Sequence, residues 1–218
     1  MQKPSRRQQA VEILIEKYMA KVTKQVMDLK PGKGISVGQS DEHQRNWTDK
    51  GWEWAVKHGN YDPSRASLNF EIARGGKIVP VDKSKTIPQR MAEDLRQRGI
   101  KDPNEGLKEP KFRTVVNIIF GGSTERMLEL AFGNQKIDTS AGVPNPGLKR
   151  MPEIEQWALD MYRFSCDKWG EENITAFIVH LDEKNPHIHA TILPIDKVSN
   201  KFSFNKIFGG NIYATKEY

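Results

Sequence analysis

Three histidines and two carboxylates lie within ten residues of one another, between positions 180 and 189. Imidazole is a common ligand of transition metals, and three protein ligands with open positions are typical of a catalytic metal site. Three of the chain's five histidines fall in this segment, so shared coordination explains them better than chance, because buried imidazoles need partners. The candidate ligands are His180, His187 and His189, and Glu183 is placed to complete the set or to orient one of them.

Two runs of β-branched and aromatic residues flank the segment, at 174–180 and 187–193, and they predict two strands. The polar stretch 182–186 between them predicts a turn, so the strands should form a hairpin or a tight crossover. Residues i and i+2 of a strand point to the same face, which sets the rings of His187 and His189 side by side. We expect Asp182 in the turn to have an orienting or structural role.

The order His-x-Asp-Glu-x-x-Pro-His-x-His resembles the metal motif of plasmid mobilization relaxases of the MobV/Pre type (Mob_Pre family, HUH endonuclease superfamily). A second block, residues 60–72, is similar to the family's Pro-Ser-Arg turn and the Leu-Asn-Tyr/Phe-Glu strand that follows it. The resemblance extends from about Lys21 to the end of the chain. It implies a divalent metal, Mn²⁺ or Mg²⁺, although the histidines by themselves do not exclude Zn²⁺.

The resemblance implies a relaxase, which nicks and rejoins one DNA strand at a transfer origin during mobilization of a plasmid or mobile element. Such an enzyme forms a covalent 5′-phospho-DNA protein intermediate, and its partners would be origin DNA and a coupling protein of the transfer apparatus. A rolling-circle replication initiator would share the chemistry, a zinc hydrolase would share the ligands, and a non-cleaving DNA-binding recombination accessory would hold a structural cation. The two sequence blocks favour mobilization.

The resemblance also implies a histidine nucleophile, in a His-Asn-x-Arg block ahead of the Pro-Ser-Arg turn. The nearest equivalent is Glu42-His43-Gln44-Arg45, where arginine follows one position early and the gap to Pro63 is longer. We therefore expect His43 to be the nucleophile, with an exposed loop histidine that only contacts phosphate as the alternative. Tyr61 is the next candidate, because tyrosine also forms covalent intermediates, and Tyr213 or Tyr218 is a more distant one.

Basic, aromatic and amide side chains elsewhere are candidates for contact with DNA. Arg65 and Asn69 would contact backbone phosphate or position active-site groups, and Glu71 would orient His43 or the metal ligands. Tryptophans at 47, 52 and 54 could stack on unpaired bases, or belong equally to a lid or core. The expected DNA-binding residues are Arg45, Trp47, Arg65, Asn69, Lys201 and Lys206.

The composition favours a polyanionic partner, because 34 Lys and Arg exceed 28 Asp and Glu, for a net charge of +6 and a pI near 9.3. Residues 1–30 carry seven basic and three acidic side chains, so we expect a basic N-terminal extension at 1–18 and one relaxase domain at 19–218. The single cysteine, Cys166, excludes a disulfide framework. No apolar run approaches the ~20 residues of a membrane span, and we expect a cytoplasmic protein.

The overall pattern predicts an α+β fold, with an antiparallel β-sheet that carries the histidines at its centre and helices packed on one face. Periodicity and capping signals supply the remaining elements. They predict a helix and first strand over 9–27 divided near Tyr18, a break at 31–34, a loop to about 59, a strand at 68–72, a helix at 88–98, a strand at 114–120, a helix at 123–132, a loop at 139–147 and a helix at 152–169.

Overall fold

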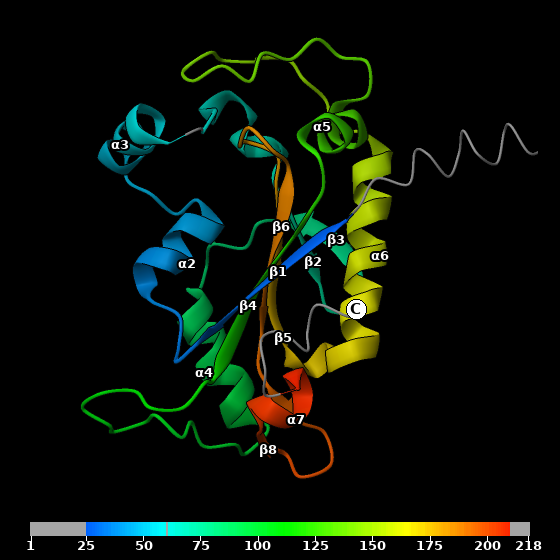
Figure 1. Ribbon diagram of the computed structural model, residues 1–218. Coiled ribbons are helices and arrows are strands. Elements are labelled where there is room, and N and C mark those ends of the chain that lie inside the picture. The colour runs from blue at the N-terminus through cyan, green and yellow to red at the C-terminus, as the bar shows by residue number, and fades with distance from the viewer. Residues whose placement is uncertain (1–24, 60, 210–218) are drawn as a thin grey trace, which may run out of the picture.

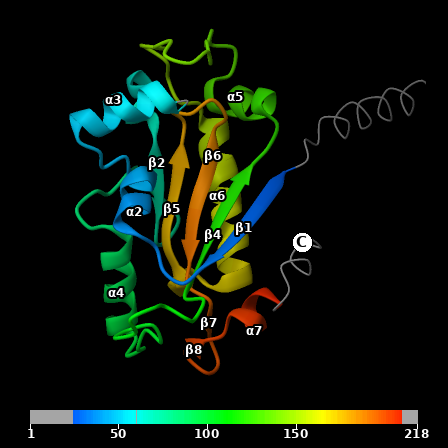
Figure 2. The same ribbon diagram turned by 60° about the vertical axis from the view of Figure 1, so that its left-hand side comes forward.

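The computed structural model describes residues 25–59 and 61–209 (Figure 1). The expected basic extension, the elements predicted for 9–24 and the tyrosines at 213 and 218 lie outside the described residues. One sheet of six strands, in the order β1-β4-β6-β5-β2-β3, runs through the middle of the molecule (Figure 2). All neighbouring strands are antiparallel. The strands are β1 (Val26–Gly32), β2 (Phe70–Ala73), β3 (Lys77–Pro80), β4 (Val115–Gly121), β5 (Ile174–His180) and β6 (His187–Ile192).

The two strands at the centre of the sheet are the histidine hairpin that the sequence predicts. Their register pairs His180 with His187 and Ile178 with His189. Directly paired residues of an antiparallel ladder share a face, and so do residues two apart on one strand. The three histidine side chains therefore lie on the same face of the sheet, at the end where β5 turns into β6.

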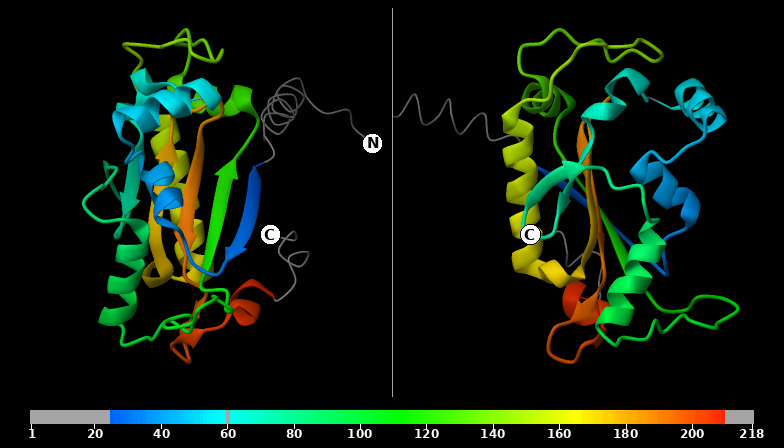
Figure 3. Two further views of the ribbon diagram at one scale, coloured as in Figure 1. Left: turned by 90° about the vertical axis from the view of Figure 1, so that its left-hand side faces the viewer. Right: turned by 180° about the vertical axis from the view of Figure 1, so that it is seen from behind.

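Helices cover both faces of the sheet (Figures 1 and 3). One face carries α5 (Thr124–Phe132) and α6 (Pro152–Trp169), and the other carries α2 (Val37–Gln44) and α4 (Ile87–Gln97), with α3 (Asp49–His58) beyond α2. The α+β class and the antiparallel sheet are confirmed, but packing of the helices on one face only was wrong. The reason is β5, which is buried along its whole length.

The two faces of β5 meet different helices. Phe177 and Val179 join the large core that contains the α6 side chains, while Ala176 and Ile178 pack against Ile87 at the start of α4. A strand that is apolar on both faces needs cover on both, which the continuous apolar run at 174–180 already signals. The histidines share the face of Ile178, so they lie on the α2 and α4 side.

Most of the predicted elements are confirmed within one or two residues, including the helices α4, α5 and α6. The long loop predicted up to residue 59 was wrong, because this segment forms α2 and α3. Both helices have side-chain caps, in which Ser36 accepts from Gln39 N and Thr48 accepts from Gly51 N. The sequence of α2 is largely polar, so the apolar periodicity that reveals the other helices is missing there. The sequence of α3 does carry apolar residues, at Trp52, Trp54, Ala55 and Val56, and this helix signal was missed.

Two strand assignments also differ from the prediction. The edge strand β1 continues through Pro31 to Gly32, since an edge strand tolerates a proline whose missing N–H faces outward. The hairpin strand β3 follows Gly75 and Gly76, both at positive φ, and had not been predicted.

The chain leaves β6 at the opposite end of the sheet from the β5–β6 turn (Figure 2). There it forms a two-stranded ladder of β7 (Ile195–Asp196) and β8 (Lys201–Phe202), followed by α7 (Phe204–Phe208). Among the helices of the described ranges, none combines the length and the apolar character that crossing a membrane requires.

Candidate metal centre and active site

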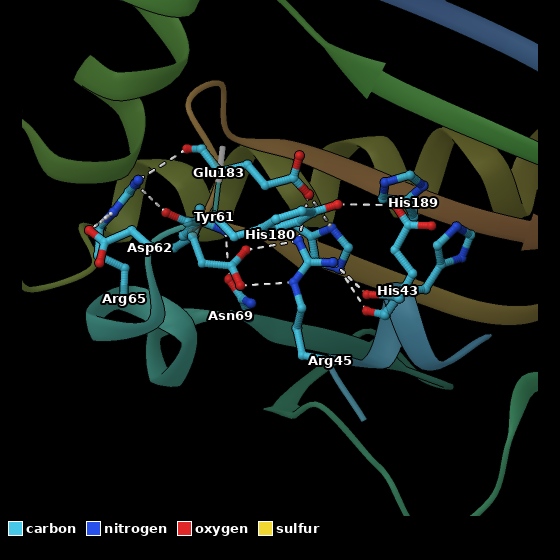
Figure 4. A network of polar contacts seen from close by, with 12 residues as sticks. His43, Arg45, Tyr61, Asp62, Arg65, Asn69, His180, Glu183 and His189 are labelled. Carbon is cyan, nitrogen blue, oxygen red and sulfur yellow. Dashed lines mark hydrogen bonds and ion pairs between the residues drawn. The ribbon is translucent and has the colours of Figure 1, made fainter. Parts of the chain in front are cut away.

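Four side chains from the β5–β6 hairpin converge on one point, and each offers a ligand atom within 4.8 Å of the others. They are His180, Glu183, His187 and His189. Figure 4 labels His180, Glu183 and His189. The Nε2 atoms of His187 and His189 lie 2.8 Å apart. That separation is close to the edge of a coordination polyhedron whose metal–nitrogen bonds are about 2.1 Å long.

Two backbone carbonyls fix which ring nitrogen faces the cluster. His180 Nε2 lies 2.7 Å from the carbonyl of His43, and His187 Nδ1 lies 2.8 Å from the carbonyl of Asn185. A carbonyl only accepts, so these nitrogens carry the protons and donate, which leaves His180 Nδ1 and His187 Nε2 with lone pairs toward the cluster. Sequence reasoning missed Asn185 because its contribution is a backbone carbonyl, which any residue type supplies.

The lone pair of His180 Nδ1 provides a test of whether the cluster suits a cation. This atom is buried without a hydrogen-bond partner among the described residues, and it faces the Glu183 carboxylate at 3.4 Å. Two electron-rich atoms that face each other in a buried site need a positive charge between them. The cluster therefore fits a divalent metal ion, with three nitrogen donors and one carboxylate.

The electrostatics favour the metal-binding protonation states. Burial lowers the pKa of His180 and of His189, so both imidazoles are neutral and keep their lone pairs. Burial alone would raise the pKa of Glu183, but its interactions with His180, His187 and Arg45 outweigh burial and lower the pKa to about 2. The carboxylate is therefore ionised at neutral pH.

Arg45 holds the acidic residues of the turn in place. It ends α2 in the left-handed conformation, with φ 52°, and its guanidinium donates to both carboxylate oxygens of Asp182, at 2.8 and 3.0 Å. A further donor pairs with Glu183. Arg45 is 3% exposed and Asp182 is fully buried, so the positive charge of the Arg45 guanidinium faces the protein interior and not solvent.

Side chains of the second sequence block, residues 60–72, form hydrogen bonds to the backbone of the same turn. Arg65, 2% exposed, pairs with Asp62 at 2.8 Å and donates to the carbonyls of Leu181 and Glu183. Asn69 Oδ1 accepts from Leu181 N at 2.7 Å. Both side chains are buried and position the ligands (Figure 4).

Two further polar residues differ from expectation. Glu71 pairs with Arg90 of α4 and accepts from Asp82 N. Among the described residues, no hydrogen bond or ion pair joins Glu71 to His43 or to the cluster. Asn145, in the loop predicted at 139–147, donates to Asp62 Oδ2 at 2.9 Å. No sequence signal marks this long-range contact.

His43 lies in the last turn of α2 and packs against the cluster. Its ring centroid is 4.2 Å from that of His189, and the side chain is 3% exposed. Burial, together with the neighbouring histidines and Arg45, lowers its pKa to about 3, so the imidazole is neutral. The structure thus brings His43 to the predicted metal ligands as a buried helix residue, not as an exposed loop residue.

Tyr61 and Trp47 form a separate aromatic layer over Arg45. The Tyr61 hydroxyl donates to Glu42 at 3.1 Å, and its ring lies 4.7 Å from the Arg45 guanidinium. Burial, then the charges of Glu183 and Glu42, raises the pKa of Tyr61. Trp47 is half-buried, and its ring meets those of Trp52 and Tyr61 edge-on.

An open cleft of about 420 Å³ gives access to the cluster. Its lining includes Glu42, Ile119, Glu183, His187 and His189. The remaining predicted DNA contacts lie elsewhere: Lys201 and Lys206 belong to the far end of the sheet, where Lys206 pairs with Asp196 at 2.8 Å. His58 stacks on Trp54 away from the cluster.

Comparisons with known proteins agree with this site. The model of the Mob_Pre family, described as plasmid recombination enzyme, matches residues 149–216, which include the histidine hairpin. Two curated plasmid recombination enzymes match: one from Lactiplantibacillus plantarum, 45% identical over 47 residues, and one from Bacillus sp, 37% identical over 56 residues. The aligned segments are 20% and 25% of this chain and 13% and 14% of those enzymes.

Two manganese-bound crystal structures of the MobM relaxase domain (MOBV; Mob_Pre), bound to plasmid pMV158 oriT DNA, share the fold. Their TM-scores are 0.57 and 0.55, with 18% and 17% identity, over 85% of this chain and 77% of theirs. The family model covers less than a third of this chain, in the segment that carries the histidine hairpin. The predicted resemblance to Mob_Pre relaxases is supported by this match and by the shared fold. The histidine cluster resembles the metal site of HUH endonucleases.

Proposed function

We propose that this chain nicks and rejoins one DNA strand at a transfer origin, with His43 as the nucleophile. The observation that carries the proposal is the packing of His43 against the four-ligand cluster, 4.2 Å from His189. The relatives support the substrate and the metal, because the MobM structures are described as bound to oriT DNA and to manganese. A coupling protein of the transfer apparatus belongs to the same proposal.

The four ligands would hold Mn²⁺ or Mg²⁺ at the floor of the cleft. An ion bound there would draw charge from the oxygens of the scissile phosphate and fix its orientation. The hydrogen bond from His180 to the His43 carbonyl ties the last turn of α2 to the hairpin. This bond keeps the attacking ring in register with the ligands.

The reaction has two balanced halves. Attack by His43 Nε2 forms a nitrogen–phosphorus bond and breaks the bond between phosphorus and the 3′ oxygen, which leaves with the electron pair and takes up a proton. His43 Nδ1 is buried without a partner among the described residues, so Nε2 is the nitrogen available to DNA. The 5′-phosphate stays on the protein, and attack by a 3′-hydroxyl reverses the step and rejoins the strand.

In this proposal Arg45, Arg65 and Asn69 position the ligands, because all three are buried and bonded to the 181–183 backbone or carboxylates. The proposal also assigns contacts with DNA to three further residues, Trp47, Lys201 and Lys206. Tyr61 is the weaker nucleophile candidate, since its hydroxyl is bonded to Glu42 and its ring packs on Arg45.

The test is intact-protein mass spectrometry after incubation with Mn²⁺ and single-stranded oligonucleotides that cover the transfer origin of the encoding element. We expect a mass gain equal to the DNA fragment 3′ of the nick, and peptide mapping should assign it to His43. His43→Gln should abolish the adduct. His58→Gln is the matched control and should form it normally, because His58 lies outside the cluster.

Other outcomes redirect the assignment. An adduct that maps to Tyr61, and is lost in Tyr61→Phe, would keep the enzyme class and overturn the histidine nucleophile. Tight DNA binding without any cut under Mn²⁺, Mg²⁺ or Zn²⁺ would favour the non-cleaving accessory.

A further inference from the structure

A cavity of about 740 Å³ opens at the end of the sheet opposite the histidines. The loop that follows α4 forms one wall, and β8 with the start of α7 forms the other. Figures 2 and 3 show these segments near one another at that end of the sheet. The lining contains no acidic residue. Its charged and aromatic members are Lys101, Lys111, Arg113, Lys201, Phe112, Phe202 and Phe204, and we call this cavity the basic pocket.

Hydrogen bonds hold both walls of the basic pocket in shape. Asn104 Oδ1 accepts from the backbone N–H groups of Lys111 and Phe112, each at 2.9 Å. Its Nδ2 donates to the carbonyls of Phe112 and Lys33, at 2.8 and 3.0 Å. The Asn200 side chain then bridges the walls by donating to the Arg98 carbonyl at 3.3 Å. The pocket is therefore built by specific contacts within the fold.

The positive charges of the pocket face outward. Lys101, Lys111, Arg113 and Lys201 are exposed, and none of them forms an ion pair with another residue of the ranges 25–59 and 61–209. The Arg113 guanidinium lies 4.7 Å over the Phe204 ring, which supports it while leaving its N–H donors to solvent. Nearby Lys206, by contrast, is paired with Asp196.

The aromatic surface narrows the class of ligand. The Phe112 side chain is 52% exposed beside these cations, although an isolated phenyl ring gains nothing from water. Exposed rings next to basic side chains are the platform on which unpaired bases stack while the cations meet the backbone phosphates. The cavity volume also falls in the ~300–1,000 Å³ range of pockets that enclose a small molecule, so it can admit a base. Duplex DNA offers no such unpaired base.

We propose that the basic pocket binds single-stranded DNA away from the nick, with a base against Phe112 and neighbouring phosphates on Lys111, Arg113 and Lys201. The identity of the polyanion rests on the proposed function. The seven residues of β5, at about 3.3 Å each, separate the pocket from the cluster by roughly 20 Å. At about 3.4 Å per nucleotide, a stacked strand covers that distance in about six nucleotides.

The test measures affinity of the full chain for fluorescent single-stranded oligonucleotides by anisotropy, across a series of salt concentrations. One oligonucleotide extends three nucleotides to each side of the nick, and the other extends fifteen. The double variant Lys111→Ala with Arg113→Ala is compared with Lys57→Ala with Lys77→Ala, which removes the same charge from exposed sites outside the pocket.

We expect the pocket variant to bind the long oligonucleotide at least tenfold more weakly than the control, and the short one equally well. Loss of two phosphate contacts on a single strand should reduce the slope of log K against log salt by about 1.4. Phe112→Ala should weaken binding of the long oligonucleotide by roughly tenfold without changing that slope. Equal affinities and slopes for pocket and control variants would overturn the proposal.

Nicking of the short oligonucleotide separates this inference from the proposed function. Pocket variants should nick it at the wild-type rate. If the wild-type chain never nicks DNA but the pocket variants lose affinity for the long strand, the proposed function fails and the pocket stands. If nicking is normal and the pocket variants bind like the controls, only the pocket proposal fails.

Discussion

The two ends of the sheet use positive charge in opposite ways. At the histidine end, defined by His180, His187 and His189, the arginines at 45 and 65 are buried in ion pairs with aspartates. At the pocket end, defined by the basic pocket, Lys111 and Arg113 are exposed. Buried charges are stable only with partners, so they fix geometry, whereas exposed charges remain available to a ligand. The same residue type thus positions a site at one end and offers a binding surface at the other.

The largest expected effect separates chemistry from binding. His189→Ala removes one of the four ligands and should reduce single-turnover nicking with Mn²⁺ on the order of 10³-fold, because metal catalysis supplies several kcal/mol. Manganese binding, measured by titration calorimetry, should be lost in parallel. The pocket variant Lys111→Ala with Arg113→Ala should keep both properties. Normal nicking by His189→Ala would remove the metal role of the histidine end.

The second prediction compares an arginine from each end. Arg45→Met leaves Asp182 buried without its partner, and removal of one member of a buried pair costs about 3–5 kcal/mol of unfolding free energy. Arg113→Met removes an exposed guanidinium that lies over Phe204 and should cost under about 1 kcal/mol. Urea unfolding of both variants measures the contrast. Equal losses would show that burial does not distinguish the two arginines.

The sequence predicts the histidine end better than its supports. A hairpin of contiguous residues sets the spacing of the candidate ligands, so local periodicity was enough to place them on one face of the sheet. The supporting residues arrive from far along the chain: Arg45 meets Asp182 across 137 positions, and Asn145 meets Asp62 across 83. No local pattern encodes such a contact. The sequence also does not distinguish a buried arginine from an exposed one. For this reason Arg45 was predicted as a DNA contact, and Arg65 was left between a phosphate contact and a positioning role.

The helices show the same limit. The long helix α6 was predicted from its apolar spacing, whereas α2 is short and mostly polar and was predicted as loop. The helix α3 has an apolar face but only ten residues, and it was predicted as loop as well. Ser36 and Thr48, the N-cap residues of α2 and α3, are residue types that favour a helix start, so the sequence did contain a signal for both helices. Because α2 carries His43, the nucleophile candidate could be named from the sequence while its buried environment could not.

The third prediction compares two asparagines that tie backbone at opposite ends. Asn69→Ala removes the hydrogen-bond acceptor for the backbone N–H of Leu181, which lies between His180 and Glu183 in the chain. Loss of this support should weaken manganese affinity by about 10- to 100-fold. Asn104→Ala loosens the wall of the basic pocket and should leave manganese affinity unchanged. Asn104→Ala should instead weaken binding of the long oligonucleotide. Calorimetry with Mn²⁺ and anisotropy with DNA make the pair of measurements. If Asn104→Ala weakened manganese binding and Asn69→Ala did not, the two asparagines would be assigned to the wrong ends of the sheet.

The smallest expected effect concerns acid stability at the histidine end. Burial alone would raise the pKa of Asp62, but hydrogen bonds from Ser64, Asn145 and Arg65 outweigh it and lower the pKa. A carboxyl whose pKa is lower in the folded state contributes stability above its unfolded value of about 3.9, and this contribution is lost as the pH falls through the folded pKa. Asp62→Asn lacks the contribution at every pH. It should therefore be less stable than wild type by about 1.5 kcal/mol at pH 6, and the gap should close as the pH falls below about 4. Urea midpoints from pH 6 to pH 3 measure this gap, and a gap that stayed constant over the range would mean that Asp62 supports Arg65 through shape alone and not through charge.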